Sequence, residues 1–365
     1  MNWLKPDYQN CSLNVISSIA GYLGLYLSHP TLPLLDDILK EKQYQNIIVM
    51  LFDGLGMDVM EKALPEDAFL RRHTHHSLSA VFPSTTTNAT SSIECGASPR
   101  EHGWLGWTLY FPQLQKPVDL FTNQSEGKIA AEYHVANRFI PRQMIFPRIT
   151  EAGKAVASCV SKFGETRIGT LSGLFDMTLG QARDEKRRYI YTYWDEPDHT
   201  MHDKGCHHPK ILEKVRDIND RMEAFFHQLP ENTLLMLTAD HGLTDGKYLH
   251  LSDHPDLRNM LLHSPTIESR AASLHVKPEY RVAFPAAFRA AFGDHFLLMD
   301  GETFIREYLG DGEIHPSVYD SVGDYMALSV DEYCLSMEPD PHPLKGVHGG
   351  LTPEEMLVPL MIAKK

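Results

Sequence analysis

The sequence predicts an α/β fold, with a largely parallel central sheet flanked by helices and a smaller α+β cap or insert. Strongly apolar, partly β-branched runs of strand length recur along the chain, as at residues 46–52. Such runs are typical of strands buried on both faces of a parallel sheet. Helical patterns separate these runs, and strands that alternate with helices favour parallel pairing.

Size and charge narrow the class of protein. At 365 residues and 42% hydrophobic content, the chain can bury a large core. We expect a single domain spanning residues 1–365, with a possible cap or insert at about residues 248–337. The net charge of −14 argues against a protein that binds nucleic-acid polymers or anionic membranes. A small anionic substrate stays open, because bound cations invert the field locally.

The five cysteines are scattered, odd in number and contain no CxxC pair. This favours reduced thiols and a cytoplasmic location over a disulfide framework or a thiolate zinc site. The N-terminus has no compact apolar region followed by a small-residue cleavage site, so we do not expect a signal peptide.

Residues 8–35 carry no acidic or basic side chain, which raises the question of a membrane span. Asparagines, serines, glycines and a proline interrupt the stretch. Its apolar residues recur at helical spacing at Leu13, Ile16, Ala20, Leu23 and Leu27. An amphipathic helix docked on the core is therefore the better interpretation.

Further elements follow in order. In the first half we expect helices at 31–40 and 56–64, and a third helix that ends at Cys95 with Gly96 beyond it. We expect an exposed loop or strand start at 73–77 and a strand at 78–82. An aromatic wall at 104–111 and irregular structure at 112–148 follow. In the second half we expect strands at 155–160, 188–194, 232–238 and 357–363. We expect a helix at 208–229, and helices at 280–292 and 301–309 among short strands. A capping box that starts at Thr352 should open a further helix.

Metal-ligand residue types follow four of the apolar runs. The segments are Asp53-Gly, Asp195-Glu-Pro-Asp198-His-Thr-Met-His202, Asp240-His241-Gly and His348-Gly-Gly. Ligands bind outside the carboxyl ends of the strands of open α/β sheets, so these side chains would converge on one crevice. Carboxylates and imidazoles suit zinc or a similar divalent ion. The structural alternative is that each Asp caps a helix or turn, as Asp53 could for the helix at 56–64.

A fifth segment supplies hydroxyl groups at a strand-to-helix junction, in Pro83-Ser-Thr-Thr-Thr-Asn88. A hydroxyl there lies beside free backbone N–H groups and the positive end of the helix dipole, which form a natural phosphate site. Metal coordination lowers the pKa of such a hydroxyl and makes it a nucleophile. Simple N-capping by Ser84 or Thr85 is compatible with this role.

Taken together, these motifs resemble the alkaline phosphatase superfamily, and within it the type I phosphodiesterase/nucleotide pyrophosphatase branch. The resemblance covers residues 46–360. It is carried by Asp53-Gly, Phe-Pro-Ser-Thr-Thr86, Glu101-His102-Gly103, Glu-Pro-Asp198 with His202 and Gly205, Asp240-His241-Gly, and His348-Gly-Gly. It implies an alkaline-phosphatase-like fold.

The resemblance also implies two divalent metal ions, usually Zn²⁺, with Mn²⁺ or Mg²⁺ as alternatives. The implied ligands are Asp53, Asp240, His241 and Thr86 for one ion, and Asp198, His202 and His348 for the other. Asp198 is preferred over Asp195, and His202 over His199, because the family motif places the two ligands four residues apart. Thr86 is preferred over its neighbouring threonines because it lies four residues after Phe82.

The implied mechanism is an in-line displacement at phosphorus between two cations, with a covalent phospho-threonine intermediate on Thr86. One position departs from the family pattern. Trp107 stands where the nucleotide-pyrophosphatase branch has an asparagine that helps to hold a phosphate oxygen. The indole could donate one hydrogen bond or form an aromatic wall, and Asn88 could contact the phosphate instead.

We therefore expect a metal-dependent phosphodiesterase or nucleotide pyrophosphatase acting on a small phosphate ester or nucleotide. A phosphomonoesterase, a phosphonate hydrolase or a phosphomutase could use the same site. A non-catalytic metal-binding scaffold is disfavoured, because every ligand position is filled.

Overall fold

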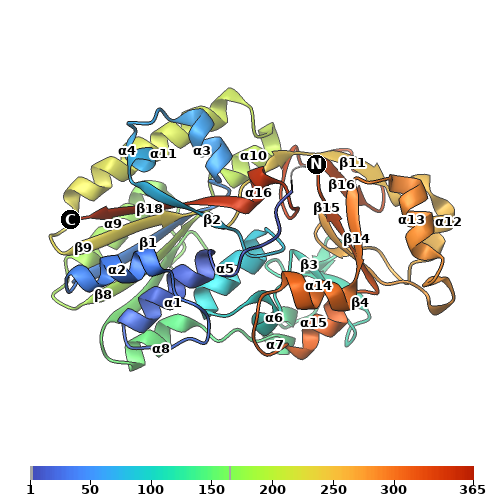
Figure 1. Cartoon of the computed structure of the whole chain (residues 1–365), viewed down its shortest axis with the longest axis horizontal. Coiled ribbons are helices and arrows are strands. Elements are labelled where there is room, and N and C mark those ends of the chain that lie inside the picture. The colour runs from blue at the N-terminus through green and yellow to red at the C-terminus, as the bar shows by residue number, and fades with distance from the viewer. Residues whose placement is uncertain (1–2, 164–165) are drawn as a thin grey trace.

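The computed structural model describes residues 3–163 and 166–365, which form two lobes side by side (Figure 1). One lobe holds the central sheet and most of the helices, and the C-terminus lies at its far end. The other lobe holds a second sheet with shorter helices against it.

The central sheet has six strands, and its order shows how distant segments meet. The order is β2 (Thr74–Ser79), β18 (Leu357–Lys364), β9 (Thr233–Thr238), β1 (Asn46–Phe52), β8 (Arg188–Trp194) and β7 (Val156–Ser161). β1 pairs in parallel with β8 and β9, and β7 with β8, whereas β18 runs antiparallel to both of its neighbours. All residues of β1 are buried, as its unbroken apolar run requires. The predicted largely parallel α/β fold is confirmed.

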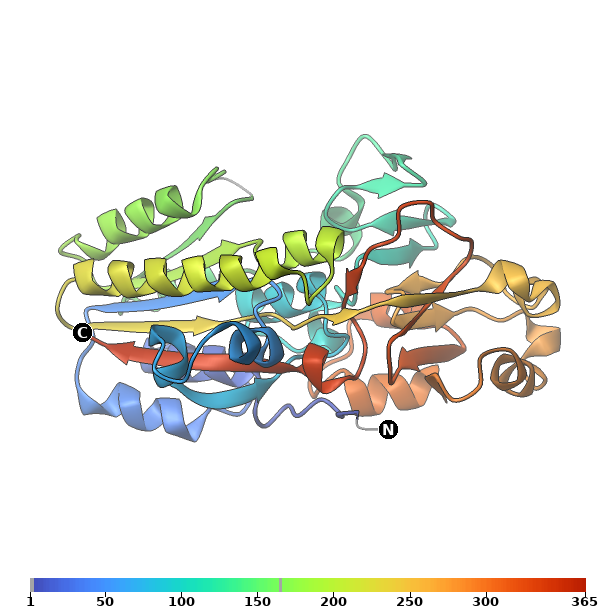
Figure 2. The same cartoon turned by 90° about the horizontal axis from the view of Figure 1, so that it is seen from above.

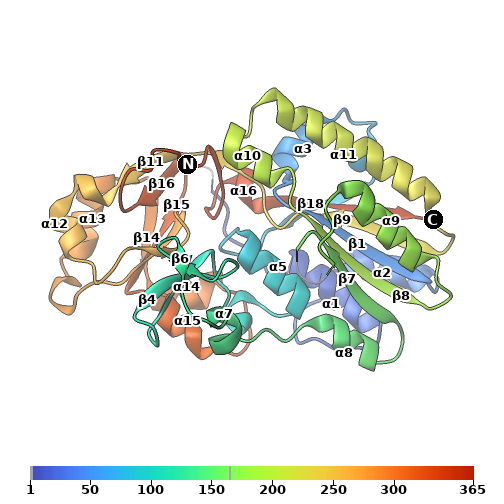
Figure 3. The same ribbon diagram turned by 180° about the vertical axis from the view of Figure 1, so that it is seen from behind.

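Helices cover both faces of this sheet (Figures 1 and 3). One face carries α3 (Met57–Ala63), α4 (Phe69–Arg72), α9 (Leu171–Ala182) and α11 (Pro209–Gln228). The opposite face carries α1 (Ser12–Tyr22), α2 (Pro33–Glu41), α5 (Thr86–Cys95) and α8 (Ile145–Glu151). Figure 2 shows the long α11 running along the direction of the strands. Its buried side chains include the apolar positions at helical spacing, which are Ile211, Val215, Ile218, Met222 and Phe225.

Helix α1 docks on the core as predicted, but it is not amphipathic. Every residue from Ser12 to Ala20 is buried, including the polar ones. The Asn14 side chain donates to the carbonyl oxygens of Tyr8 and Pro30, and Ser18 accepts from Leu32 N, so these two side chains are satisfied inside the fold. The hydroxyls of Ser12 and Ser17 have no partner among the described residues. Across residues 3–163 and 166–365, no helix combines the length and the apolar character needed to cross a membrane.

The second lobe is built on an eight-stranded antiparallel sheet. Its order is β14 (Phe296–Asp300), β15 (Tyr325–Ser329), β13 (Ala271–Leu274), β12 (Thr266–Ile267), β3 (Thr108–Phe111), β4 (Lys116–Asp119), β5 (Gln124–Ser125) and β6 (Lys128–Ile129). The pairing of Ile267 with Thr108 joins its two halves. The sheet therefore contains the strands at 108–129 as well as strands of the expected insert. The bounds of that insert, 248–337, stay a prediction.

The remaining elements are short. The helices are α6 (Pro99–His102), α7 (Val135–Phe139), α10 (Asp198–Lys204), α12 (Pro255–Asn259), α13 (Phe284–Phe292), α14 (Gly301–Tyr308), α15 (Pro316–Ser321) and α16 (Pro353–Met356), with 3-10 turns at Leu251–Asp253 and Pro278–Tyr280. The strands are β10 (Thr244–Asp245), β11 (Lys247–His250), β16 (Tyr333–Ser336) and β17 (Gly346–Val347).

Two expected segments were wrong in detail. Residues 112–148 are not irregular, because they contain β4 to β6, α7 and the start of α8. The strand expected at 78–82 is β2 at 74–79, which begins in the histidine-rich segment and pairs with β18. Both helix-end predictions are confirmed: Gly96 follows α5 with φ 63°, and Thr352 with Glu355 forms the capping box of α16.

Candidate active site

The carboxyl ends of β1, β8 and β9 meet at one edge of the central sheet and bring three of the motif segments together. Asp53 N donates to Trp194 O at 2.9 Å, and Asp198 N donates to Asp53 O at 3.0 Å. Asp240 Oδ1 accepts from Gly54 N at 3.1 Å. Backbone hydrogen bonds therefore fix the ends of these strands relative to one another, and their acidic side chains share one site.

Asp53, Asp240 and His241 form the first ligand cluster. One ligand atom from each lies within 4.8 Å of the others, and all three residues are buried. His241 Nε2 lies 3.5 Å from an oxygen of each aspartate. Asp53 does not cap a helix, because the N-cap of α3 is Gly56 and the Asp53 carboxylate instead accepts from Tyr193 OH. The helix-cap alternative for Asp53 is thus excluded.

The electrostatics of this cluster favour a bound cation. Burial, together with the charges of Asp240 and Asp198, raises the pKa of Asp53 well above its usual range. Burial and the Asp53 charge also raise the pKa of Tyr193, so the phenol stays a hydrogen-bond donor. Crowded carboxylates of this kind are unfavourable unless a positive charge joins them.

Asp198, His241 and His348 form a second cluster whose ligand atoms also lie within 4.8 Å of one another. His202 Nε2 lies 3.1 Å from Asp198 Oδ2, and His348 Nε2 lies 3.9 Å from Asp198 Oδ1. The rings of His241 and His348 stack with their centroids 3.9 Å apart. His241 therefore joins both clusters, and His202 reaches the second through Asp198.

Unpaired buried atoms show that these residues fit metal ions. Asp198 Oδ1 and Asp240 Oδ2 are buried without a hydrogen-bond partner among the described residues. Nδ1 of His202 contacts Gly346 O at 2.7 Å, and Nδ1 of His241 contacts Gly242 O at 3.1 Å. A ring that donates Nδ1–H to a carbonyl presents Nε2 as a free lone pair, which is the usual arrangement of a metal-binding histidine.

Glycines beside the ligands allow the close packing. Gly54 has φ 72°, and a Cβ there would lie 2.9 Å from Asp198 Cβ. A Cβ on Gly242 would lie 2.0 Å from Glu354 O. The glycine after Asp53 and the glycine after His241 are therefore needed to bring the strand ends together.

Thr86 is the first residue of α5 and its hydroxyl faces the first cluster. Its Oγ1 lies 3.1 Å from His241 Nε2 and 3.3 and 3.4 Å from the two Asp53 oxygens. Thr85 occupies the N-cap position but makes no capping hydrogen bond, and Ser84 donates to Gly350 O. Since neither side chain caps the helix, the backbone N–H groups at the start of α5 are left for another acceptor.

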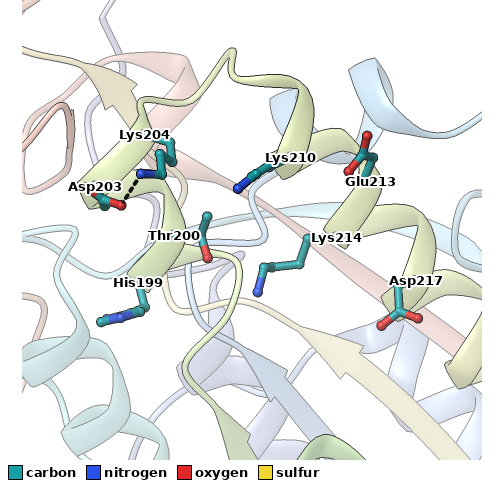
Figure 4. A pocket seen from close by; sticks show the side chains of 8 residues that line it. All are labelled: His199, Thr200, Asp203, Lys204, Lys210, Glu213, Lys214 and Asp217. Atoms are coloured by element: carbon teal, nitrogen blue, oxygen red, sulfur yellow. Dashed lines mark ion pairs between the residues drawn. The ribbon is translucent and has the colours of Figure 1, made fainter.

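The rival residues lie outside this centre. Asp195 forms an ion pair with Lys162. His199 is exposed on the outer face of α10, where it lines an open hollow of about 590 Å³ (Figure 4). The hollow lies between α10 and α11, and its other lining residues are Thr200, Asp203, Lys204, Lys210, Glu213, Lys214 and Asp217. None of the expected ligands lines it.

The expected substrate contacts are differently placed. Asn88 is fully buried, and its side chain donates to Pro83 O at 2.8 Å, which ties down the start of α5. Trp107 exposes 43% of its surface, and its backbone nitrogen donates to Glu268 Oε1 at 2.8 Å. Of the two, only Trp107 presents its side chain to solvent.

His102 of the Glu-His-Gly motif has a structural role. Its Nδ1 accepts from Trp104 N and its Nε2 donates to Ser92 Oγ, both at 3.0 Å. Burial lowers the pKa of this buried ring to about 3, so it stays neutral.

Sequence reasoning missed Tyr193 and Glu268. Tyr193 had a usable signal, because it stands at the carboxyl end of a predicted strand. Glu268 belongs to no motif, and only the pairing of β12 with β3 brings it to Trp107 and Thr85.

Comparisons with known proteins agree with this architecture. The structure is similar to murine ectonucleotide pyrophosphatase/phosphodiesterase 5, with a TM-score of 0.68 and 17% identity over 87% of this chain and 88% of that one. For the human protein of the same name the TM-score is 0.67 with 15% identity, each chain covered to 87%. An inactive threonine-to-alanine variant of the murine protein, solved in complex with AMP, gives a TM-score of 0.65 with 17% identity and the same coverage. At these identities the likeness concerns the fold.

Sequence comparison gives two further matches. GPI ethanolamine phosphate transferase 3, catalytic subunit, of Mus musculus is 31% identical over 70 residues, which is 19% of this chain and only 6% of that protein. Residues 47–350 match the family of type I phosphodiesterases and nucleotide pyrophosphatases. The predicted hydrolase class is thereby confirmed at the level of the family. The chain belongs to the type I phosphodiesterase/nucleotide pyrophosphatase family of the alkaline phosphatase superfamily.

Proposed function

We propose that this protein is a metal-dependent phosphodiesterase or nucleotide pyrophosphatase, in which Thr86 is the nucleophile and forms a covalent phospho-threonine intermediate at a two-metal site. The observation that carries the proposal is the position of the Thr86 hydroxyl, 3.1 Å from His241 and 3.3 Å from Asp53, at the open N-terminus of α5. Membership in the family supports the reaction class.

The proposed ligands are Asp53, Asp240 and His241 for one ion, and Asp198, His202 and His348 for the other. Two divalent cations would supply charge neutralisation at a transferring phosphoryl group and a lowered pKa for a bound hydroxyl. Nitrogen and oxygen ligands without thiolates suit Zn²⁺, and Mn²⁺ or Mg²⁺ would serve the carboxylates.

The protein groups have separate tasks in this mechanism. The Thr86 hydroxyl lies within hydrogen-bond distance of Asp53 and His241, which would hold its oxygen beside the first ligand cluster and toward the phosphorus. The backbone N–H groups at the start of α5 face the negative charge that develops on the phosphoryl oxygens. Thr86 Oγ1, after giving its proton to solvent, forms a bond to phosphorus while the bond to the leaving alkoxide breaks, and the alkoxide takes up a proton from water. A water molecule then cleaves the bond between Thr86 Oγ1 and phosphorus, which restores the hydroxyl and releases the phosphate product.

The proposed substrate is a small phosphate ester or a nucleotide. Support comes from the AMP complex of the structurally similar murine protein and from the exposed indole of Trp107, on which a flat group could stack. The net charge of −14 speaks against nucleic-acid polymers and anionic membranes as partners. Five free cysteines support a cytoplasmic location, which cell fractionation would check.

Substrate and metal are tested together. Purified protein is assayed with Zn²⁺, Mn²⁺ and Mg²⁺ on bis(p-nitrophenyl) phosphate, p-nitrophenyl phosphate and phosphonoacetate. We expect about two ions per chain, fastest cleavage of the diester, and loss of cleavage on chelation. Faster cleavage of the monoester or the phosphonate would instead identify a phosphomonoesterase or a phosphonate hydrolase. Metal binding without turnover would identify a scaffold.

A further inference from the structure

A second hollow lies at the edge of the central sheet opposite the candidate active site. It is formed by the segments that precede β1, β7 and β8, together with the ends of α1 and α2. Arg188 pairs with Asn46 and with Val156, so the starts of these three strands lie side by side. The ligand clusters follow the other ends of β1 and β8. The 7 residues of β8 therefore separate the two places by about 20 Å.

The charge of this hollow is entirely positive. It has a volume of about 600 Å³, no acidic side chain among the described residues lines it, and its basic lining residues are Lys40, Lys42, Lys154 and Arg187. The hollow between α10 and α11 has a similar volume of about 590 Å³, but its lysines are balanced by Asp203, Glu213 and Asp217 (Figure 4). In a chain with 48 acidic and 34 basic residues, a lining with basic side chains alone calls for an explanation.

Two of the four cations have partners within the fold. Lys40 lies in the last turn of α2, where a positive charge interacts favourably with the helix dipole, and its Nζ lies 3.3 Å from Asp37 Oδ1. Lys42 Nζ donates to Lys365 O at 3.1 Å. Local structure therefore explains part of the charge, and the argument for a ligand depends on the other two cations.

The guanidinium of Arg187 is held rigidly but is incompletely satisfied. Its Nε donates to Tyr44 O at 2.9 Å, and its central carbon lies 4.7 Å from the centre of the Tyr22 ring. These contacts fix the plane of the group, while its Nη2 is buried without an acceptor in the part of the chain that the structure describes. A buried donor without an acceptor is costly, and an oxygen atom of a ligand would satisfy it.

The ammonium group of Lys154 forms no ion pair or hydrogen bond within residues 3–163 and 166–365. Its side chain lies against Gly24, which has φ 89°, and a Cβ there would lie 3.0 Å from Lys154 Cε. The acidic residues Glu41 and Asp184, near the lining in sequence, pair with Lys364 and with Arg188 instead. The charge of Lys154 is thus left for a partner from outside the chain.

We propose that this hollow is a binding site for a small oligophosphate, an anion of two or more linked phosphate groups that is free or attached to a nucleoside. A guanidinium matches the oxygens of a phosphate group with paired N–H donors, and lysines bind phosphate as point charges. Cations from three separate segments suit an anion with more than one charged group. The volume suits a small molecule. The site is separate from the ligand clusters and does not depend on the proposed diesterase activity.

The first test is a calorimetric titration of inorganic pyrophosphate into protein freed of metal by a chelator. Without metal, the crowded carboxylates of the candidate active site repel anions, so binding there is suppressed. We expect one pyrophosphate per chain, with an affinity that falls as sodium chloride is added. Orthophosphate should bind about tenfold more weakly. Absence of pyrophosphate binding, or equal binding of orthophosphate, would overturn the proposal.

The second test compares two double variants that each remove two positive charges. Lys42→Gln with Lys154→Gln changes exposed side chains of the basic hollow and should weaken pyrophosphate binding about tenfold or more. Lys204→Gln with Lys210→Gln changes the charge-balanced hollow and should leave the affinity unchanged. An equal loss in both variants would reveal a general effect of net charge and contradict the site. The diesterase kcat/KM of the first variant should equal that of the wild type, which keeps this test apart from that of the proposed function.

Titration of ADP under the same conditions identifies the source of the phosphate groups. Tighter binding of ADP than of pyrophosphate supports the site and shows that a nucleoside contributes to recognition. Weaker or equal binding of ADP supports a site for the free oligophosphate. Binding of neither compound contradicts the proposal.

Discussion

Asp53 is a buried carboxylate whose nearest ionisable neighbours include two other carboxylates. Burial and the charges of Asp240 and Asp198 raise its pKa, so without metal the folded protein retains a proton at Asp53 that the unfolded chain loses. The free energy of unfolding of the metal-free protein therefore decreases as the pH rises above the usual carboxyl range. Bound cations would remove this loss of stability by neutralising the crowded carboxylates. The position of Asp53 therefore indicates a role in metal binding more than in folding.

We predict that Asp53→Asn separates stability from activity. Removing the crowded charge should leave the melting temperature of the metal-free protein unchanged or higher, while diesterase kcat/KM falls about 100-fold or more. Thermal unfolding with and without Zn²⁺, alongside kinetics, measures both effects. Asp195→Asn is the matched control, because Asp195 pairs with Lys162 and belongs to neither ligand cluster, and it should retain activity. Unfolding of Asp53→Asn with normal turnover per folded molecule would contradict the ligand role.

The pair of His202 and Asp198 makes metal binding dependent on pH. Although burial opposes it, the Asp198 charge raises the pKa of His202 from 6.5 to about 9, and the His202 charge lowers that of Asp198 to about 2. In the metal-free protein the contribution of His202 to stability is complete below pH 6.5 and is lost as the pH rises through about 9. At neutral pH His202 is therefore protonated before metal binds.

Metal binding should consequently release that proton. We predict that Zn²⁺ binding near pH 7.5 releases about one proton fewer from His202→Gln than from the wild type, because a proton held by Asp53 is released from both. Calorimetric titrations in two buffers of different ionisation enthalpy report the number of protons. Identical release from the wild type and the variant would show that His202 is not protonated beforehand.

At the scale of elements, the long buried strands could be predicted and the second sheet could not. The apolar runs of β1, β8 and β9 are each buried on both faces, so composition alone defines them. The strands between Thr108 and Ile129 are only two to four residues long, too short for a clear apolar pattern, and the single pair of Ile267 with Thr108 joins them to the distant part of the sheet. β2 likewise takes its bounds from β18, which lies almost at the other end of the chain. Pairing over such sequence distances leaves little local signal.

The same distinction applies to the candidate site. Its acidic and histidine residues follow strands or lie in motifs of fixed spacing, so the sequence indicated them. Glu268 lies on a turn between two-residue and four-residue strands, and nothing in its neighbourhood distinguishes it before the fold is known. Asn88, which the sequence offers as an alternative phosphate contact, is buried, and its side chain donates to Pro83 O at the start of α5.

The connection between β1 and α3 depends on Gly54, and we predict that Gly54→Ala disrupts it. The residue has φ 72°, and an added Cβ would lie 2.6 Å from Leu243 Cδ1 and 2.9 Å from Asp198 Cβ. The free energy of unfolding should fall by about 1–3 kcal/mol or more, with weaker metal binding. Gly21→Ala in α1 is the control, because nothing lies within 4 Å of its Cβ position, and it should stabilise by about 0.5–1 kcal/mol. Denaturant unfolding measures both, and equal stability of the two variants would contradict the packing argument.

At the scale of the whole molecule, a buried ion pair joins the second sheet to the segment that follows His348. Arg270 Nε and Nη2 donate to the two oxygens of Glu355 at 2.6 and 2.7 Å, and both side chains are fully buried. The Glu355 carboxylate also accepts from Gly350 N, two residues after His348. The pair thus links the lobe that carries Glu268 to the loop of a candidate ligand.

Removing one partner of this ion pair should strongly destabilise the folded protein. We predict that Arg270→Met lowers the free energy of unfolding by about 3–5 kcal/mol, because Glu355 is left charged and unpaired. The double variant Arg270→Met with Glu355→Met should recover much of the loss, since no uncompensated charge then stays buried. A double-mutant cycle by denaturant unfolding measures the coupling. Additive losses would contradict a direct pairing.

The central claim is that Thr86 is the nucleophile, and covalent trapping tests it most directly. Protein mixed with bis(p-nitrophenyl) phosphate is quenched in acid within a turnover, digested and analysed by mass spectrometry. We predict a p-nitrophenyl phosphoryl group on Thr86, and a loss of kcat/KM of about 1,000-fold or more in Thr86→Ala, with Thr87→Ala as the matched control. An unmodified Thr86, together with full diesterase activity of Thr86→Ala, would contradict the account.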